Sequence, residues 1–233
     1  MARLTFLYLL TSFSVGPYDN NVYVLSDPKT KEALLIDAAN DAPRIIKELE
    51  GLRVSHILTT HGHADHVQAL KPVREQTHAQ FTCHEADESM MPIKADHRVH
   101  DGERFRFGEY ELVAMHTPGH TPGSVCFLGG EHLFSGDTLF PGGPGNTANP
   151  YASFATIIES IRGRLFTLSD ETQVLPGHGK PTTIGRERPH LDEWIQRGWE
   201  QPNRHARPAI SLLAIPDRSP VSAAFARVTI GSS

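Results

Sequence analysis

The hydrophobic residues of this chain fall mainly into short runs separated by turns that are rich in Gly, Pro and Asp. Runs of this kind, rich in β-branched and aromatic residues, predict β-strands. The predicted strands cover residues 13–15, 21–25, 33–37, 54–60, 79–83, 105–107, 110–115, 124–128, 131–135 and 172–175. Hairpin turns are predicted at residues 16–17, 26–30, 108–109 and 129–130.

Other stretches carry apolar residues at helical spacing. Residues 151–168 have a polar opposite face and predict an amphipathic helix, with apolar positions at Phe154, Ile157, Ile158, Ile161 and Leu165. Further helices are predicted at residues 41–51, with Pro43 in the first turn, and at 67–73, 85–91 and 186–199. Strands followed by helices, twice over, fit an α/β fold whose two-sheet core is covered by helices on both sides.

The two ends of the chain need separate interpretation. The apolar run at residues 4–10 is too short to span a membrane and predicts a first strand. An export signal is the alternative, although no Ala-x-Ala cleavage site follows the run. Residues 201–233 are rich in Pro, Arg, Ala and Ser and predict a loosely ordered tail. The sequence therefore predicts one domain over residues 1–200.

Composition narrows the classes of function. The chain has 233 residues and a net charge of −5, which gives no electrostatic reason to expect nucleic-acid binding. Its two cysteines are too few for a disulfide framework. Cys83 and Cys126 both lie in strand-like runs, so they are predicted to be buried free thiols. Reduced cysteines fit a cytoplasmic protein.

The candidate chemistry is concentrated in the segment Thr59-Thr60-His61-Gly62-His63-Ala64-Asp65-His66, which lies between a predicted strand and a predicted helix. Imidazole nitrogens and carboxylate oxygens suit zinc, and imidazole also suits iron. Residues at i and i+2 on an extended loop project from the same side, so His61 and His63 can hold one metal ion. Asp65 and His66 can face a second ion.

Three more potential ligands follow later in the chain: His120 in TPGHTPG, Asp137 in FSGDT and His178 in LPGHGK. Each comes after a strand-like run and a turn that contains glycine. At these positions and in this order, the motifs resemble those of the metallo-β-lactamase superfamily of metal-dependent hydrolases. The resemblance covers residues from about 13 to 198 and implies an αββα sandwich of two mixed β-sheets flanked by helices.

The resemblance also implies how the ligands are shared. His61, His63 and His120 bind the first metal ion, and a second ion is bound by Asp65, His66 and His178. Asp137 bridges the two, since a carboxylate has two oxygens. Two divalent ions are expected, with zinc first and iron or manganese as alternatives. Asp37 matches a position that supports the metal loop from behind, although a turn or helix-capping role is equally compatible with its place after a strand.

A mechanism follows from such a site. A water that bridges two metal ions loses its proton far more readily than bulk water, by up to roughly eight pKa units at zinc. The resulting hydroxide attacks a carbonyl carbon, and one metal ion stabilises the oxyanion. Asp65 is the predicted catalytic residue, because it can orient the hydroxide and accept its proton. Ser124 and Ser135 lie near the motifs, but no nucleophilic side chain is needed.

The local sequence is most similar to the hydroxyacylglutathione hydrolase (glyoxalase II) branch, which cleaves glutathione thioesters. That branch usually has a lysine and a tyrosine at the positions of Asn146 and Ala148, and a helical domain after the last motif. Because these features are missing here, the predicted activity is that of a small-molecule thioesterase whose thiol need not be glutathione. Asn146 and Lys180 are the predicted substrate contacts, and Arg186 and Arg188 are further candidate cations.

Other functions remain open at this point. A mononuclear iron persulfide dioxygenase has a similar layout, and a lactone or ester hydrolase of the same fold shares the ligand set. Phe140 stands where lactone hydrolases tend to have a tyrosine, and Asp137 argues against a true β-lactamase. A scaffold without metal is the non-enzymatic alternative. The predicted partner is a small-molecule thioester or ester, with neither nucleic acid nor membrane.

Overall fold

The computed structural model describes residues 8–198. The predicted tail, the domain boundary at residue 200 and most of the predicted first strand lie outside these residues. In the described part, one strand, β1 (Leu9–Val15), joins the end of that apolar run to the strand predicted at 13–15.

The first six strands form one sheet in sequence order: β1, β2 (Asn20–Ser26), β3 (Glu32–Ile36), β4 (Arg53–Leu58), β5 (Gln80–His84) and β6 (His97–Val99). The first three strands pair antiparallel, whereas β3 to β6 pair in parallel. Parallel neighbours require a crossover, and α1 (Ala42–Glu48) and α2 (Leu70–Thr77) provide two of them.

A second sheet has the order β14-β13-β10-β9-β8-β7. Its strands are β7 (Arg104–Phe107), β8 (Tyr110–His116), β9 (Val125–Gly129), β10 (His132–Gly136), β13 (Gln173–Pro176) and β14 (Thr182–Thr183). Only the β10–β13 pair is parallel, and α3 (Phe154–Gly163) lies in its crossover. The short strands β11 (Leu139–Phe140) and β12 (Gly143–Pro144) form a separate ribbon.

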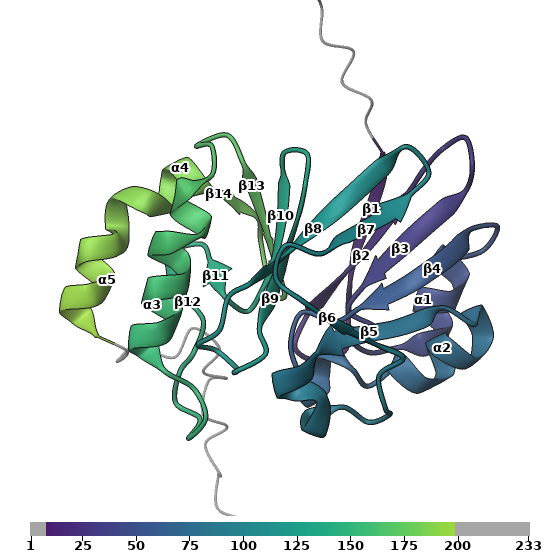
Figure 1. Cartoon of the computed structure of the whole chain (residues 1–233), viewed down its shortest axis with the longest axis horizontal. Coiled ribbons are helices and arrows are strands. Elements are labelled where there is room, and N and C mark those ends of the chain that lie inside the picture. The colour runs from purple at the N-terminus through teal and green to yellow at the C-terminus, as the bar shows by residue number, and fades with distance from the viewer. Residues whose placement is uncertain (1–7, 199–233) are drawn as a thin grey trace, which may run out of the picture. The chain divides into compact units, whose positions relative to one another are not determined.

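Three clusters of buried apolar residues hold the layers together. One packs α1 and α2 against the first sheet, through residues such as Ile45, Val73 and Leu35. The second lies between the sheets, and the third packs α3 and α5 (Leu191–Arg197) against the second sheet. Figure 1 shows the two groups of helices on opposite outer sides of the sheets. The predicted αββα sandwich of two mixed sheets is therefore confirmed.

Several predicted helices differ in extent or type. Residues 85–91 form a 3₁₀ helix, Glu85–Met90, instead of an α-helix, and Ala64–His66 is another 3₁₀ turn before α2. The helix predicted at 151–168 begins at Phe154 and is followed by the 3₁₀ turn Leu165–Thr167. The helix predicted at 186–199 is divided into α4 (Ile184–Glu187), a 3₁₀ turn Arg188–His190 and α5. Pro189 explains that division, because proline lacks the N–H that a continuous helix would use.

We expect that removing the cap of α3 destabilises the protein by about 1 kcal/mol. The Ser153 hydroxyl accepts the backbone N–H of Thr156 at 3.2 Å, which satisfies one of the free donors at the start of the helix. Urea denaturation of Ser153→Ala should show a lower midpoint with an unchanged slope. Ser153→Asp restores a capping oxygen and should recover most of the loss; an aspartate variant as unstable as the alanine variant would contradict the cap.

Candidate metal centre

The loops that carry the sequence motifs meet at one edge of the sandwich. Because β3 and β4 are parallel, Asp37 and the segment 59–66 follow their strands at the same edge. The same holds for Asp137 and His178, which follow the parallel strands β10 and β13. An isolated antiparallel bridge between Asn20 and His178 joins the two sheets there.

Three of the predicted ligands form a compact group of imidazoles. The Nδ1 atom of His63 lies 3.0 Å from Nε2 of His61 and 2.9 Å from Nε2 of His120. These distances place three ring nitrogens around one point, from two loops that are 57 residues apart in the sequence. The arrangement is the one predicted for the first metal ion.

A second group lies beside the first. The Nε2 atoms of His66 and His178 are 3.1 Å apart, and Oδ2 of Asp65 lies 3.3 Å from Nε2 of His178. His66 is fully buried, whereas the Asp65 side chain keeps 27% of its surface exposed. This group corresponds to the predicted second set, and it opens to solvent at Asp65.

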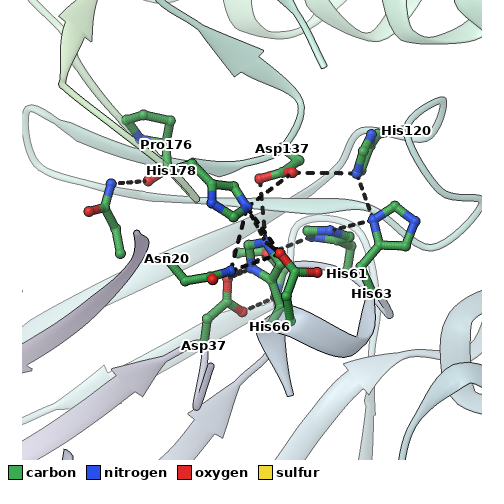
Figure 2. Close-up of polar contacts among 12 residues, drawn as sticks. Asn20, Asp37, His61, His63, His66, His120, Asp137, Pro176 and His178 are labelled. Atoms are coloured by element: carbon green, nitrogen blue, oxygen red, sulfur yellow. Dashed lines mark hydrogen bonds and ion pairs between the residues drawn. The ribbon is translucent and has the colours of Figure 1, made fainter. Parts of the chain in front are cut away.

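Asp137 faces both groups. Its Oδ1 lies 3.5 Å from Nε2 of His66, and its Oδ2 lies 3.6 Å from Nε2 of both His120 and His178 (Figure 2). The Oδ1 atom is buried and has no hydrogen-bond partner among residues 8–198. A buried carboxylate oxygen without a partner is costly, and a cation between the two groups would compensate it. The donor set therefore fits two metal ions with Asp137 between them.

The outward nitrogen of each histidine is held by the protein, which fixes the orientation of the rings. Their partners are Oγ1 of Thr60 for His61 (3.1 Å), Oη of Tyr151 for His63 (2.8 Å), Oδ2 of Asp37 for His66 (2.8 Å), the carbonyl of Asn146 for His120 (2.8 Å) and the carbonyl of Tyr18 for His178 (2.8 Å). The other nitrogen of each of the five rings faces the centre of the cluster and is available to bind a metal ion.

Burial and the neighbouring charges shift the pKa values of the clustered histidines in opposite directions. Burial and the neighbouring imidazoles lower the pKa of His61 well below its usual range and that of His63 to about 4. Burial also opposes protonation of His66, but the carboxylates of Asp137 and Asp37 outweigh it and raise the pKa of His66 to about 9. His61 and His63 are thus in the neutral form that metal binding requires.

Comparison with known proteins identifies the family. Residues 15–178 match the family model of the metallo-β-lactamase superfamily. The chain belongs to this superfamily. The hydroxyacylglutathione hydrolase GloC of Haemophilus influenzae is 32% identical in an alignment 196 residues long, which covers 75% of this chain and 92% of GloC. Human mitochondrial persulfide dioxygenase ETHE1 is 35% identical over 162 residues, 67% of this chain and 62% of ETHE1.

One of the similar solved structures contains iron. TTHA1623, in a di-iron-bound form, matches with a TM-score of 0.69 and 31% identity over 76% of this chain and 96% of that protein. Members of the superfamily are mostly metal-dependent hydrolases, and the relatives above include named enzymes. The His/Asp cluster of this chain could hold metal ions, and it does not by itself select one metal.

Asp37 accepts hydrogen bonds from two residues in and beside the cluster, His66 and Thr60. Its Oδ2 accepts the Nδ1–H of His66 at 2.8 Å and the hydroxyl of Thr60 at 2.7 Å, and its Oδ1 accepts the backbone N–H of Thr60 at 2.8 Å. Asp37 is 1% exposed. The residue therefore bonds three donors and orients a candidate ligand, which is the supporting position that the resemblance implies.

We expect Asp37→Asn to weaken zinc binding at the His66 group by about 10–100-fold. An amide has one oxygen for three donors, and its NH₂ would face a donor. Asp37 has φ 57°, and asparagine tolerates that left-handed conformation. Competition with a chromophoric chelator measures the change. Asp41→Asn is the matched control, since Asp41 has φ 52° and its side chain accepts the N–H of Arg44 at the start of α1; equal losses in the two variants would contradict the role of Asp37.

The predicted substrate contacts occupy different positions. Lys180 is exposed two residues after His178. Asn146 reaches the centre through its backbone carbonyl, and its side-chain oxygen accepts the N–H of Ala148 at 2.7 Å. Arg188 instead has a structural role: its side chain pairs with Asp170 and donates to the carbonyl of Phe166.

The structure adds residues that the motifs do not contain. Asn20 is 1% exposed and donates from Nδ2 to Oδ2 of Asp65 at 3.0 Å. Tyr151, which is 44% exposed, contacts the outward nitrogen of His63. The sequence gives only a weak signal for Asn20, a polar residue directly before the strand predicted at 21–25. It gives no signal for Tyr151, which stands at the start of the helix predicted at 151–168.

The two cysteines lie outside the centre as buried free thiols, as predicted. Burial raises the pKa of Cys83 to about 12 and that of Cys126 to about 11. Because the thiolate is the nucleophile, neither residue is activated for chemistry at neutral pH. Within residues 8–198, no helix has the length and apolar character needed to cross a bilayer.

Proposed function

We propose that this protein is a dinuclear metal-dependent hydrolase of small-molecule thioesters, similar to hydroxyacylglutathione hydrolases, with a thiol that need not be glutathione. The observation that carries the proposal is the position of Asp137, with one oxygen toward His66 and the other toward both His120 and His178. A carboxylate between two groups of nitrogen donors is what a two-metal centre requires. We propose zinc as the native metal, with iron or manganese as alternatives.

Bound divalent ions would supply an activated water and a Lewis acid for the carbonyl oxygen. Asp65 is placed to orient that water and take its proton, since it is the most exposed carboxylate of the cluster. Asn20 donates to Oδ2 of Asp65 at 3.0 Å and fixes the rotation of the carboxylate. Without bound metal, burial alone would raise the pKa of Asp65, but the hydrogen bond with His178 and the charge of His66 hold the pKa of Asp65 below its usual range. Asp65 is therefore ionised at neutral pH.

The substrate class rests on the similarity to GloC over most of both chains. A thiolate is a good leaving group, so an activated water and an oxyanion site suffice for the reaction. Lys180, exposed beside the His178 loop, is the proposed contact for a substrate carboxylate. Asn146 is the second proposed contact, because it is exposed and its backbone carbonyl lies 2.8 Å from Nδ1 of His120.

A persulfide dioxygenase is the second candidate, favoured by the 35% identity to human ETHE1. It would use one iron ion and consume oxygen. A lactone or ester hydrolase is the remaining alternative within the same chemistry. These functions differ in metal content and in co-substrate, so one purified sample can separate them.

The test combines metal analysis with turnover. Bound metal per chain is quantified first, and cleavage of S-lactoylglutathione is then followed, together with a panel of acyl thioesters of other small thiols. Two metal ions with thioester turnover would support the proposal. Metal-loaded protein that is inactive on every acyl-thiol would overturn the thioesterase assignment, and a single iron with oxygen uptake on a glutathione persulfide would favour the dioxygenase.

The remaining parts of the proposal concern the setting of the reaction. We propose a small-molecule substrate, with neither a nucleic acid nor a membrane as partner, in accordance with the net charge of −5. A cytoplasmic location is proposed because both cysteines are free. Fractionation of cells that produce the protein tests the location, and a gel-shift assay tests the exclusion of nucleic acid.

A further inference from the structure

Asp87 is a fully buried carboxylate that lies outside the ligand groups and has no part in the reaction proposed above. It belongs to the 3₁₀ helix Glu85–Met90 and is 0% exposed. Three donors surround it: the backbone N–H of Gly62 at 2.8 Å, the backbone N–H of Gly123 at 2.7 Å and the hydroxyl of Thr121 at 2.6 Å. Such charge-assisted bonds are roughly twice as strong as neutral ones.

The donors come from the two loops that carry the first group of imidazoles. Gly62 stands between His61 and His63, and Thr121 directly follows His120. The carboxylate therefore links these loops at positions next to the three ring nitrogens that converge within 3.0 Å. In the second group, the supporting partners are Asp37, Asn20 and the carbonyl of Tyr18.

Close packing around Asp87 explains why both loop positions are glycine. A Cβ on Gly123 would lie 2.6 Å from Cγ of Asp87, and a Cβ on Gly62 would lie 2.7 Å from Cβ of Met90 on the same 3₁₀ helix. Such distances are not found between real atoms of these types. Only glycine at these two positions allows the helix to approach both loops and bond their N–H groups.

We infer that Asp87 is a positioning residue that holds the His61–His63 loop and the His120 loop in register, and thereby sets the metal affinity of the first group selectively. The three imidazoles stand on two separate loops, so the position of His120 relative to His61 and His63 depends on how those loops are joined. Loss of the carboxylate leaves two buried N–H groups without their acceptor, and the loops then shift relative to one another. The second group has its own supports and is unaffected.

This inference rests on the proposed metal centre, so its test measures metal binding by the first and the second group of ligands separately. His178→Ala removes a ligand of the second group and leaves the first, whereas His120→Ala does the reverse. Zinc affinity is measured in each background by competition with a chromophoric chelator. Adding Asp87→Asn should weaken zinc binding about 10–100-fold in the His178→Ala background, and change it by less than about twofold in the His120→Ala background.

A milder variant keeps the test valid if Asp87→Asn fails to fold. Thr121→Val removes one of the three donors and leaves the carboxylate and both glycine bonds, so a smaller loss is expected in the same background only. Thr121→Ser keeps the hydroxyl and should bind zinc as the parent does. Thermal unfolding of the zinc-free proteins separates lost folding from lost affinity.

The outcomes are distinct. Equal losses in both backgrounds, or no loss in either, would overturn the positioning role of Asp87. If neither single-group background binds zinc and the unaltered protein binds none, the proposed metal centre itself fails, and this inference fails with it. A loss confined to the His178→Ala background would support the assignment.

Discussion

Asp65→Asn is expected to lower kcat for thioester hydrolysis by about 10²–10⁴-fold, the range that a positioned acid–base group contributes. The amide keeps the size of the side chain and can still accept the hydrogen bond from Asn20, but it cannot take a proton. It is also a weaker ligand beside His66 and His178. Saturating zinc in the assay separates the loss of the base from the loss of metal.

A matched control for this variant is available nearby. Asp19 is exposed in the turn before Asn20 and has φ 52°, so Asp19→Asn removes one negative charge beside the centre without strain. Its kcat should remain within about twofold of the parent, because exposed charges are screened by solvent. If Asp65→Asn kept more than a tenth of the parental kcat at saturating zinc, the role of Asp65 as the base would be wrong.

The sequence predicted the fold, and the candidate ligands that it indicated lie together in the structure, because both depend on local patterns. Strand runs with turn residues at their ends placed the His61 to His66 segment and Asp137 directly after strands. Parallel pairing then brings such strand ends to one edge of a sheet, and β10 and β13 follow this rule. The short strands β6, β11, β12 and β14 were not predicted, since runs of two or three residues do not rise above the background pattern.

The supporting residues could not be predicted in the same way. Asp87 contacts Gly62 and Gly123, which are 25 and 36 residues away, and Asn20 contacts Asp65 across 45 residues. Neither residue belongs to a motif, so only the folded chain shows what it touches. The 3₁₀ type of the helix Glu85–Met90 could not be predicted from its residues either, and its buried residue, Asp87, bonds loops of the centre.

Asp137→Ala is expected to reduce bound metal from two ions to one per chain or fewer and to lower thioester turnover by about 10³-fold or more. The basis is the several kcal/mol that a metal centre contributes to the transition state, with each 1.4 kcal/mol worth tenfold in rate. Oδ1 of Asp137 is buried and has no hydrogen-bond partner within residues 8–198, and Oδ2 faces candidate ligands of both groups. Removing the side chain takes away a carboxylate that, in the described part of the chain, lies near both sets of nitrogens.

Stability gives a second readout for the same variant. Metal that binds only the folded state raises the free energy of unfolding by RT ln(1 + [metal]/Kd), so the rise in melting temperature on adding zinc should be smaller for Asp137→Ala. Asp170→Ala is the control, because Asp170 is an exposed aspartate that pairs with Arg188 and is not one of the candidate ligands. If Asp137→Ala retained two zinc ions and parental turnover, Asp137 would not bridge the groups. One retained metal ion with lost turnover would instead show that hydrolysis requires both metal ions.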